Sequence, residues 1–277
     1  MVFMEFVKYQ GLGNDFILID CVKIKIDGLN ALGKKLCDRH FGIGADGLIA
    51  VFPSASADYK IRIINSDGTE PEMCGNGIRC AMRFVFDYIK PQRKLTFETL
   101  AGPIKTELLA ENLVKVDMGA PKLTAAQIPL NISDSDGRAV DIPVKLEGGK
   151  IKGTGVSMGN PHFVIFVEDI KKTDVAKTGK EVENNTAFPQ KTNVEFVQVI
   201  TPSRLCMKVW ERGVGITLAC GTGACASLVA GVLNNKTERL ALVELDGGQL
   251  TVEWPDDGAS VFMTGPATEV FSGVFKE

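Results

Sequence analysis

Two short cysteine motifs, Cys74-Gly75-Asn76-Gly77 and Cys220-Gly221-Thr222-Gly223, lie 146 residues apart in this chain. The same separation relates pairs outside the motifs: Gly13 and Gly159, Asn14 and Asn160, Gly102 and Gly248, and Gly119 and Gly265. The sequence therefore indicates two copies of one unit, each with a cysteine at the same place. Two equivalent thiols suit the transfer of a proton from one face of a carbon atom to the other, because one thiolate removes a proton while the other thiol supplies one.

Both cysteines precede a segment with the composition of a helix, so each thiol is expected at a helix N-terminus. The helix dipole and the unbonded backbone N–H groups there favour an anion, which predicts a thiol pKa below the ordinary value of about 8.5. The glycines after Cys74 and Cys220 let backbone N–H groups approach a bound carboxylate closely. The other five cysteines are expected to be small apolar side chains of the core: Cys21, Cys37, Cys80, Cys206 and Cys225.

Polar residues precede each cysteine at matched positions. Asn65 lies nine residues before Cys74, and Glu211 lies nine residues before Cys220. Glu211 could hold the ammonium group of an amino acid and Arg212 its carboxylate. The alternative is an exposed turn that carries a surface ion pair.

Two further matched segments, Gly13-Asn14-Asp15 and Gly159-Asn160-Pro161-His162, each precede an apolar strand. Asn and Gly are ordinary turn residues, but their repetition at the same offset makes Asn14 and Asn160 candidate site residues. His162 could orient or deprotonate a cysteine. His40 is expected to be structural.

The composition narrows the class of protein. A length of 277 residues predicts about two domains, and a net charge of −3 without a Lys/Arg stripe argues against nucleic-acid binding. The N-terminal segment lacks the pattern of a signal peptide. The longest uncharged run, 217–235, contains glycines and polar residues, so a membrane span is not expected.

Seven cysteines without a secretory signal indicate reduced thiols and a cytoplasmic location. The sequence has no Cys-x-x-Cys pair and only two histidines, so no metal site is expected. No phosphate-binding loop or dinucleotide-binding glycine motif is present. We therefore expect no cofactor.

The elements around the motifs repeat in the same order. Expected strands lie at 16–19, 59–63, 95–100, 113–118, 163–166, 205–209, 241–245, 250–254 and 261–264, and expected helices at about 29–38, 77–89 and 223–233. The helix at 223–233 is apolar all round, which is typical of a helix enclosed by other elements.

We predict an α+β fold of two pseudo-symmetric domains that arose by internal duplication. Each domain would be a curved, mostly antiparallel, barrel-like sheet around a central helix, with the active site in the cleft between the domains. The predicted halves are residues 1–118 and 119–264. The tail, residues 265–277, exceeds what the repeat needs and is a candidate to return to the first half.

Taken together, these motifs resemble those of the diaminopimelate epimerase family over essentially the whole chain. The matching segments are Gly11-Leu12-Gly13-Asn14-Asp15-Phe16, Asn65-Ser66-Asp67-Gly68, Cys74-Gly75-Asn76-Gly77-Ile78-Arg79-Cys80, Gly159-Asn160-Pro161-His162, Glu211-Arg212-Gly213 and Ala219-Cys220-Gly221-Thr222-Gly223-Ala224-Cys225-Ala226. The resemblance implies a cofactor-independent isomerase that interconverts LL- and meso-diaminopimelate for lysine and peptidoglycan synthesis. It also implies a possible homodimer.

The resemblance assigns roles by motif. Cys74 and Cys220 would be the two acid–base residues, with His162 and Glu211 supporting the thiols. The substrate-binding residues would be Asn14, Asn65, Gly75, Asn76, Asn160, Asn193, Glu211, Arg212, Gly221 and Thr222. One position departs from the family pattern: Gly47, the equivalent of Asn193 in the repeat, stands where many members carry a substrate-contacting glutamine.

Two other functions remain open at this point. A proline or hydroxyproline racemase would share the architecture and the paired cysteines, but its substrate has no distal amino-acid group to engage Glu211 and Arg212. A thiol redox sensor would use the Cys74/Cys220 pair as a switch and would leave the surrounding polar motifs without a role.

Overall fold

The computed structural model describes residues 3–22, 24, 26–110, 112–134 and 136–276. The chain divides into two compact units, unit 1 with residues 1–117 and 264–277 and unit 2 with residues 118–263. Unit 2 is therefore inserted between two segments of unit 1. The return to unit 1 runs through β16 (Phe262–Pro266).

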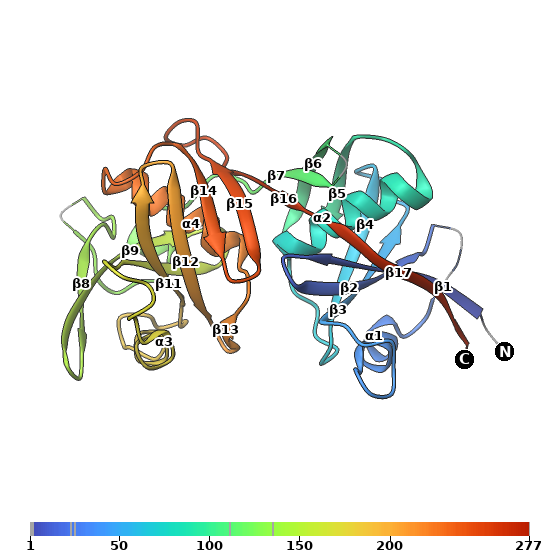
Figure 1. Ribbon diagram of the computed structural model, residues 1–277, viewed down its shortest axis with the longest axis horizontal. Helices are drawn as coiled ribbons and strands as arrows, with labels where there is room; N and C mark the ends of the chain where they lie inside the picture. The colour runs from blue at the N-terminus through green and yellow to red at the C-terminus, as the bar shows by residue number, and fades with distance from the viewer. Residues whose placement is uncertain (1–2, 23, 25, 111, 135, 277) are drawn as a thin grey trace. The chain divides into compact units, whose positions relative to one another are not determined.

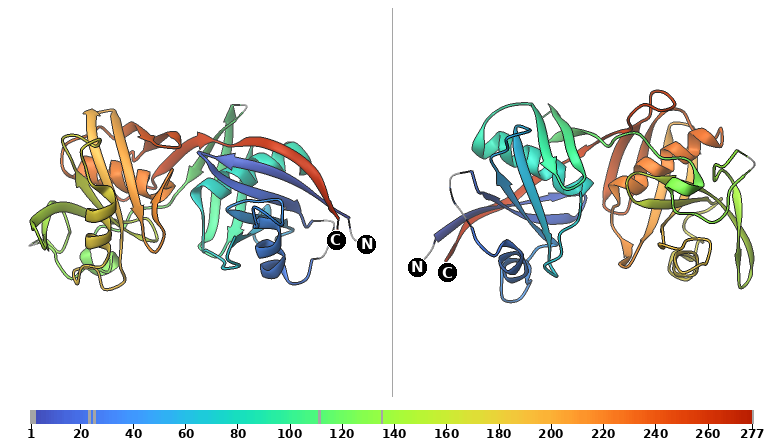
Figure 2. Two further views of the ribbon diagram at one scale, coloured as in Figure 1. Left: turned by 60° about the horizontal axis from the view of Figure 1, so that its bottom comes forward. Right: turned by 180° about the vertical axis from the view of Figure 1, so that it is seen from behind.

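Unit 1 contains one curved, mostly antiparallel sheet (Figure 1). Besides β16, its strands are β1 (Phe3–Gly11), β2 (Asn14–Asp20), β3 (Gly47–Phe52), β4 (Tyr59–Asn65), β5 (Lys94–Thr99), β6 (Gly102–Ala110), β7 (Leu113–Asp117) and β17 (Thr268–Lys276). β2–β3 and β4–β5 are its parallel pairs. β17 runs antiparallel to β1 along its length, so the segment after unit 2 completes the sheet of unit 1 (Figures 1 and 2).

Two helices pack on this sheet from opposite sides. α1 (Leu29–Cys37) lies against β3 and β4 and buries Leu29 and Leu36. α2 (Gly75–Phe84), extended by a π-helical turn at Val85–Ile89, contacts β1, β2, β3, β6 and β7. Because these strands curve around it, α2 is the central helix, and nine of its ten residues are buried.

Unit 2 repeats this arrangement. Its strands are β8 (Ile142–Leu146), β9 (Gly149–Ser157), β10 (Pro161–Phe166), β11 (Asn193–Thr201), β12 (Arg204–Glu211), β13 (Gly215–Thr217), β14 (Leu240–Leu245) and β15 (Gly248–Glu253), and a 3-10 turn lies at Ala125–Gln127. α3 (Val175–Glu183) packs outside on β11 and β12. α4 (Gly221–Leu233) lies against β9, β10, β11, β12, β14 and β15 (Figure 2).

The duplication extends to close packing details. Gly33 of α1 and its equivalent Gly179 of α3 each face a large side chain of the sheet. A Cβ atom added at Gly33 would lie 2.7 Å from Ile64 Cγ2, and one added at Gly179 would lie 2.5 Å from Trp210 Cβ. Ile64 and Trp210 are themselves equivalent in the repeat. In both units the outer helix can approach the sheet only because this helix position is a glycine.

The predicted α+β fold of two pseudo-symmetric halves is confirmed, as is the buried character of the helix near 223–233. Two expectations were wrong in detail. The central helices begin two residues earlier than predicted, since Cys74 and Cys220 cap them directly. The outer helix α3 was not predicted, because it buries few apolar side chains, chiefly Val175 and Val182.

Candidate active site

The two cysteines occupy the same local geometry in their separate units. Cys74 has φ −134° and ψ 117° at the N-cap of α2, and Cys220 has φ −121° and ψ 111° at the N-cap of α4. Each sulfur accepts a backbone N–H from the third helical residue, Gly77 at 3.5 Å and Gly223 at 3.4 Å. A thiol thus takes the capping role that Ser or Asp usually fills.

In unit 1, Asn14 links the first turn of α2 to the rim of the sheet. Its Oδ1 accepts from the Cys74 thiol at 3.7 Å and from Asn76 Nδ2 at 3.3 Å. Its Nδ2 donates to Asp46 Oδ2 at 2.8 Å. The side chains of Asn14, Asn76 and Cys74, which the sequence placed in one site, are therefore in contact.

A buried arginine supports this helix start and was missed by the sequence reasoning. Arg79 is fully buried; its guanidinium donates to Gly75 O and Asn76 Oδ1 at 3.0 Å each and to Pro266 O at 3.1 Å. Its equivalent in unit 2 is Cys225. The signal that could have revealed it is an arginine flanked by apolar residues within a predicted helix.

In unit 2, Asn160 makes the contact equivalent to that of Asn14. Its Nδ2 donates to Thr222 Oγ1 at 3.3 Å, and Thr222 Oγ1 lies 3.4 Å from Cys220 Sγ. Asn160 Oδ1 faces His162 Nε2 at 3.0 Å. The structure therefore brings Cys220, Thr222, Asn160 and His162 together, and His162 is linked to the thiol through Asn160 and Thr222.

The other ring nitrogen of His162 faces a carboxylate that the sequence reasoning missed. His162 Nδ1 lies 2.7 Å from Glu195 Oε1, and both side chains are completely buried. A glutamate inside the apolar run Val194-Glu195-Phe196-Val197 was the available signal, because charged side chains are rarely buried without a partner.

Glu211 lies close to the Cys220 thiol. Its carboxylate accepts hydrogen bonds from Thr217 and from Cys220. Burial raises the pKa of Glu211 above its ordinary value, and the nearby Glu195 raises it further against the opposing effect of Thr217. Glu211 and Cys220 are therefore in direct contact in the structure.

The predicted pKa direction for Cys220 was wrong. Burial raises the pKa of this thiol well above its ordinary value, and the charges of Glu211 and Glu195 raise it further. The hydrogen bonds from Thr222 and the Gly223 N–H act in the opposite direction but do not outweigh burial. The surroundings of Cys220 in this structure therefore favour the thiol over the thiolate.

The remaining predicted residues differ in how much of their hydrogen-bonding capacity the protein uses. Asn193 is buried; its Nδ2 donates to Pro161 O at 2.8 Å and its Oδ1 accepts the Arg212 N–H at 2.9 Å. Asn193 therefore holds the backbone of Arg212, whose exposed side chain donates to Gln190 O.

Asn65 is half-buried and donates to Thr69 Oγ1 at 3.0 Å. Gly75 and Gly221 form the buried first positions of α2 and α4.

Gly47, the position that departs from the expected family pattern, is tightly enclosed by its neighbours. A Cβ atom added there would lie 3.0 Å from Ile64 O and 3.2 Å from the Phe16 ring. The glycine thus permits close contact between β3, β2 and β4.

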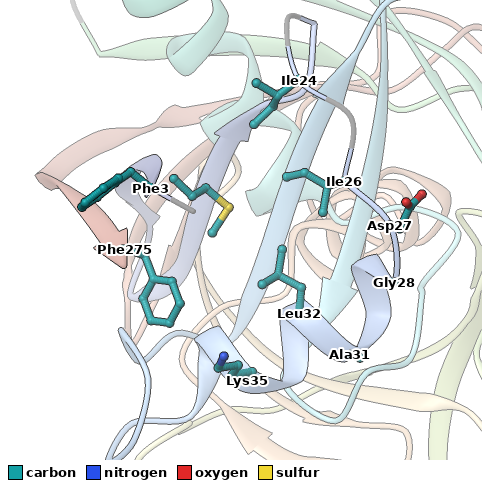
Figure 3. Close-up of a pocket in the computed structure, with 10 residues that line it drawn as sticks. Phe3, Ile24, Ile26, Asp27, Gly28, Ala31, Leu32, Lys35 and Phe275 are labelled. Atoms are coloured by element: carbon teal, nitrogen blue, oxygen red, sulfur yellow. The ribbon is translucent and has the colours of Figure 1, made fainter. Parts of the chain in front are cut away.

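A separate pocket in unit 1 has a volume of about 750 Å³ and contains no cysteine or histidine (Figure 3). Its lining is mainly apolar and includes Phe3, Ile26, Leu32 and Phe275.

Within the described ranges, no group of three or more His, Cys, Asp or Glu side chains is placed to hold a metal ion. None of the helices described has the length and hydropathy needed to cross a membrane.

Comparisons with known proteins agree with this organisation. A family model described as diaminopimelate epimerase matches residues 6–124 and 154–270. A protein named diaminopimelate epimerase from a Picosynechococcus strain is 52% identical over 276 residues, covering 98% of each chain. One from Pelotomaculum thermopropionicum is 50% identical over 280 residues, covering 98% of this chain and 99% of that protein.

Solved structures with much lower identity share the fold. A Bacillus anthracis phenazine biosynthesis protein has a TM-score of 0.72 at 14% identity, covering 100% of both chains. A hydroxyproline epimerase from Agrobacterium vitis has a TM-score of 0.69 at 14% identity, covering 98% of this chain and 92% of that one. The family is decided by the sequence matches, which span nearly the full length: the chain belongs to the diaminopimelate epimerase family.

Proposed function

We propose that this chain catalyses the cofactor-independent epimerisation of LL-diaminopimelate to meso-diaminopimelate, a step of lysine and peptidoglycan precursor synthesis, in the cytoplasm. The observation that carries the proposal is the pair of cysteine N-caps with matched geometry on α2 and α4. Family membership supports the choice of substrate.

In the proposed reaction, one cysteine acts as a thiolate and removes the α-proton. The other acts as a thiol and delivers its proton to the opposite face of the same carbon. The proton count is conserved, and the two thiols exchange protonation states in each turnover. The reaction requires both half-sites to close on a single substrate, and this closure is part of the proposal.

The backbone N–H groups at the starts of α2 and α4 would hold the carboxylate at the reacting centre. Gly75-Asn76 and Gly221-Thr222 supply these positions, and the negative charge that develops on proton removal is stabilised there. The distal end of the substrate would meet Asn14, Asn65, Asn160, Asn193, Glu211 and Arg212. Such contacts would distinguish diaminopimelate from proline.

The decisive experiment is ¹H NMR of diaminopimelate in D₂O with the reduced protein. We expect loss of the α-proton signal without added cofactor. Cys74→Ala and Cys220→Ala should each lower the exchange rate by at least about 100-fold, the lower end of general acid–base effects. Cys206→Ala is the control and should retain activity. It changes a half-buried cysteine whose thiol donates a hydrogen bond to Glu244.

Three outcomes would refute the assignment. Near-full activity of either thiol variant would contradict the two-thiol mechanism. Exchange into proline or hydroxyproline, but not diaminopimelate, would favour the racemase alternative. No exchange into any amino acid would favour a redox sensor.

We also propose that the protein forms a homodimer through the outer surface of β17 and β1. Two large apolar side chains on the same face of this strand pair are exposed there: Phe3 at 64% and Val274 at 57%. Apolar surface gathered on neighbouring strands is typical of an interaction site. Val274→Lys should shift the molar mass in analytical ultracentrifugation from dimer to monomer, with Val214→Lys, an exposed residue of unit 2, as the control. A monomeric wild-type protein would refute this proposal.

A further inference from the structure

A buried glutamate side chain lies behind the start of α4. Glu195 on β11 is completely inaccessible, and its Oε1 lies 2.7 Å from His162 Nδ1. Its second oxygen, Oε2, has no hydrogen-bond partner among the described residues. A carboxylate in this state is costly to bury unless the site gains from its charge.

Glu195 also lies directly beside the first turn of α4. A Cβ atom added to Gly223 would be only 2.7 Å from Glu195 Oε1. The Gly223 N–H is the group that donates a hydrogen bond to Cys220 Sγ. Glu195 therefore adjoins the backbone that holds the thiol.

A continuous chain of polar contacts leads from Glu195 to the same thiol. It passes from Glu195 Oε1 to His162 Nδ1 at 2.7 Å, from His162 Nε2 to Asn160 Oδ1 at 3.0 Å, from Asn160 Nδ2 to Thr222 Oγ1 at 3.3 Å, and from Thr222 Oγ1 to Cys220 Sγ at 3.4 Å. Each member fixes the orientation of the next, because His and Asn side chains must match donors to acceptors.

Unit 1 has no His–Glu pair at the equivalent place, although the scaffold is the same. The equivalents of His162 and Glu195 are Phe16 and Ile49, both buried and apolar. A Cβ atom added at Gly77, the equivalent of Gly223, would be 3.1 Å from Ile49 Cδ1. An apolar pair therefore suffices for packing at this place in the fold, so packing alone does not explain Glu195.

We propose that Glu195 is a positioning residue of the Cys220 half-site: it fixes His162 and, through Asn160 and Thr222, the orientation of the Cys220 thiol. Three side chains from the surrounding elements carry or can carry charge near this thiol, namely His162 on β10, Glu195 on β11 and Glu211 on β12. Burial and the charges of Glu211 and Glu195 raise the pKa of Cys220. The inference rests on the proposed function for its effect on turnover, but not for its structural readouts.

The first test is ¹⁵N NMR of histidine side chains. The chain has two histidines, and the exposed His40 provides an internal reference. Glu195→Gln keeps the shape and removes the charge, so we expect the His162 ring resonances to shift while those of His40 remain. Unchanged His162 resonances in the folded variant would overturn the proposal.

The second test is the pH profile of alkylation of each cysteine by iodoacetamide, followed by peptide mass spectrometry. In Glu195→Gln, Cys220 should react at lower pH than in the wild type, since a negative charge near the sulfur is lost. Cys74 in the same sample should keep its profile. Glu238→Gln removes an exposed carboxylate of unit 2 and is the matched control.

The third test uses the arrangement of unit 1 itself. The double variant His162→Phe/Glu195→Ile installs the apolar pair of Phe16 and Ile49 in unit 2. If Glu195 only supports packing, this variant should retain both stability and turnover, and that result would overturn the proposal. We expect it to fold but to lose about 10- to 100-fold in kcat with little change in KM, the scale on which misorienting a reacting group acts.

These tests separate the inference from the proposed function. If the wild type does not act on diaminopimelate but the NMR and alkylation responses occur, the proposed function fails and the role of Glu195 stands. If the wild type is active and Glu195→Gln leaves both the His162 resonances and the Cys220 alkylation profile unchanged, the role of Glu195 fails and the proposed function stands.

Discussion

At the scale of single residues, Cys74 and Cys220 share a backbone geometry but have different surroundings. Carboxylates lie near Cys220, whereas Asn14 lies beside Cys74. A helix terminus contributes about 0.3–1 kcal/mol to an adjacent charge, which is less than one pKa unit. Burial can shift a pKa by about 3–5 units. The helix start therefore cannot make Cys220 a thiolate against its burial.

The pKa of Cys220 leads to a prediction for Glu211→Gln. Because its pKa is raised, the Cys220 thiol stays protonated at neutral pH and should be alkylated faster only as the pH rises. Removing the Glu211 charge should move this rise to lower pH. Alkylation measured by mass spectrometry across pH 6–11 checks the shift, and an unchanged profile would contradict it. Glu238→Gln, which changes an exposed carboxylate of unit 2, serves as the control.

At the scale of elements, the starts of α2 and α4 are equivalent glycine turns with different neighbours. Behind Gly77 lies a terminal methyl group of Ile49, which can move by rotation of its side chain. Behind Gly223 lies the carboxylate of Glu195, which is held by His162. The same substitution should therefore have different consequences in the two helices.

Gly77→Ala and Gly223→Ala test this difference as a matched pair. Alanine favours a helix by about 0.8–1.0 kcal/mol over glycine. At Gly77 this gain should offset a mild contact at 3.1 Å and leave stability within about 1 kcal/mol of the wild type. At Gly223 the 2.7 Å contact with Glu195 should destabilise unit 2 by about 1–3 kcal/mol. Urea unfolding measures both; equal effects would show that Glu195 is free to move.

The elements also show what a sequence can reveal. The repeat of Cys74 at Cys220 predicted both central helices, because a duplicated scaffold preserves the positions of turns and glycines. It did not reveal Glu195, since β11 is buried on both faces there and has no alternation of polar and apolar residues to mark a site. The pKa of Cys220 was predicted in the wrong direction because its burial depends on packing between distant segments.

At the scale of the whole molecule, unit 1 depends on a segment from beyond unit 2. β17 pairs with β1 from Lys276 opposite Phe3 to Thr268 opposite Gln10. Gly273 permits this pairing, because a Cβ atom there would lie 2.9 Å from the Phe6 ring. β17 is therefore an integral strand of unit 1.

Gly273→Val should weaken this strand pairing. The added side chain must displace Phe6, and overpacking of this kind costs about 1–3 kcal/mol. Gly148→Val, at an exposed position with no atom within 4 Å of an added Cβ, is the control and should change stability by less. Hydrogen exchange followed by mass spectrometry should show faster exchange in β1 of the Gly273 variant. Equal exchange in both variants would contradict the role given to β17.

The insertion of unit 2 into unit 1 has a consequence for synthesis on the ribosome. Residues 118–263 of unit 2 are continuous and can fold as they emerge, whereas β1 must wait for β17. Gln10 and Thr268 are 258 residues apart, so at about 5–20 residues per second β1 stays without this partner for tens of seconds. An unpaired strand edge invites aggregation. The nascent chain is therefore most vulnerable at the strand that is made first, and molecular chaperones that shield strand edges would have to act there.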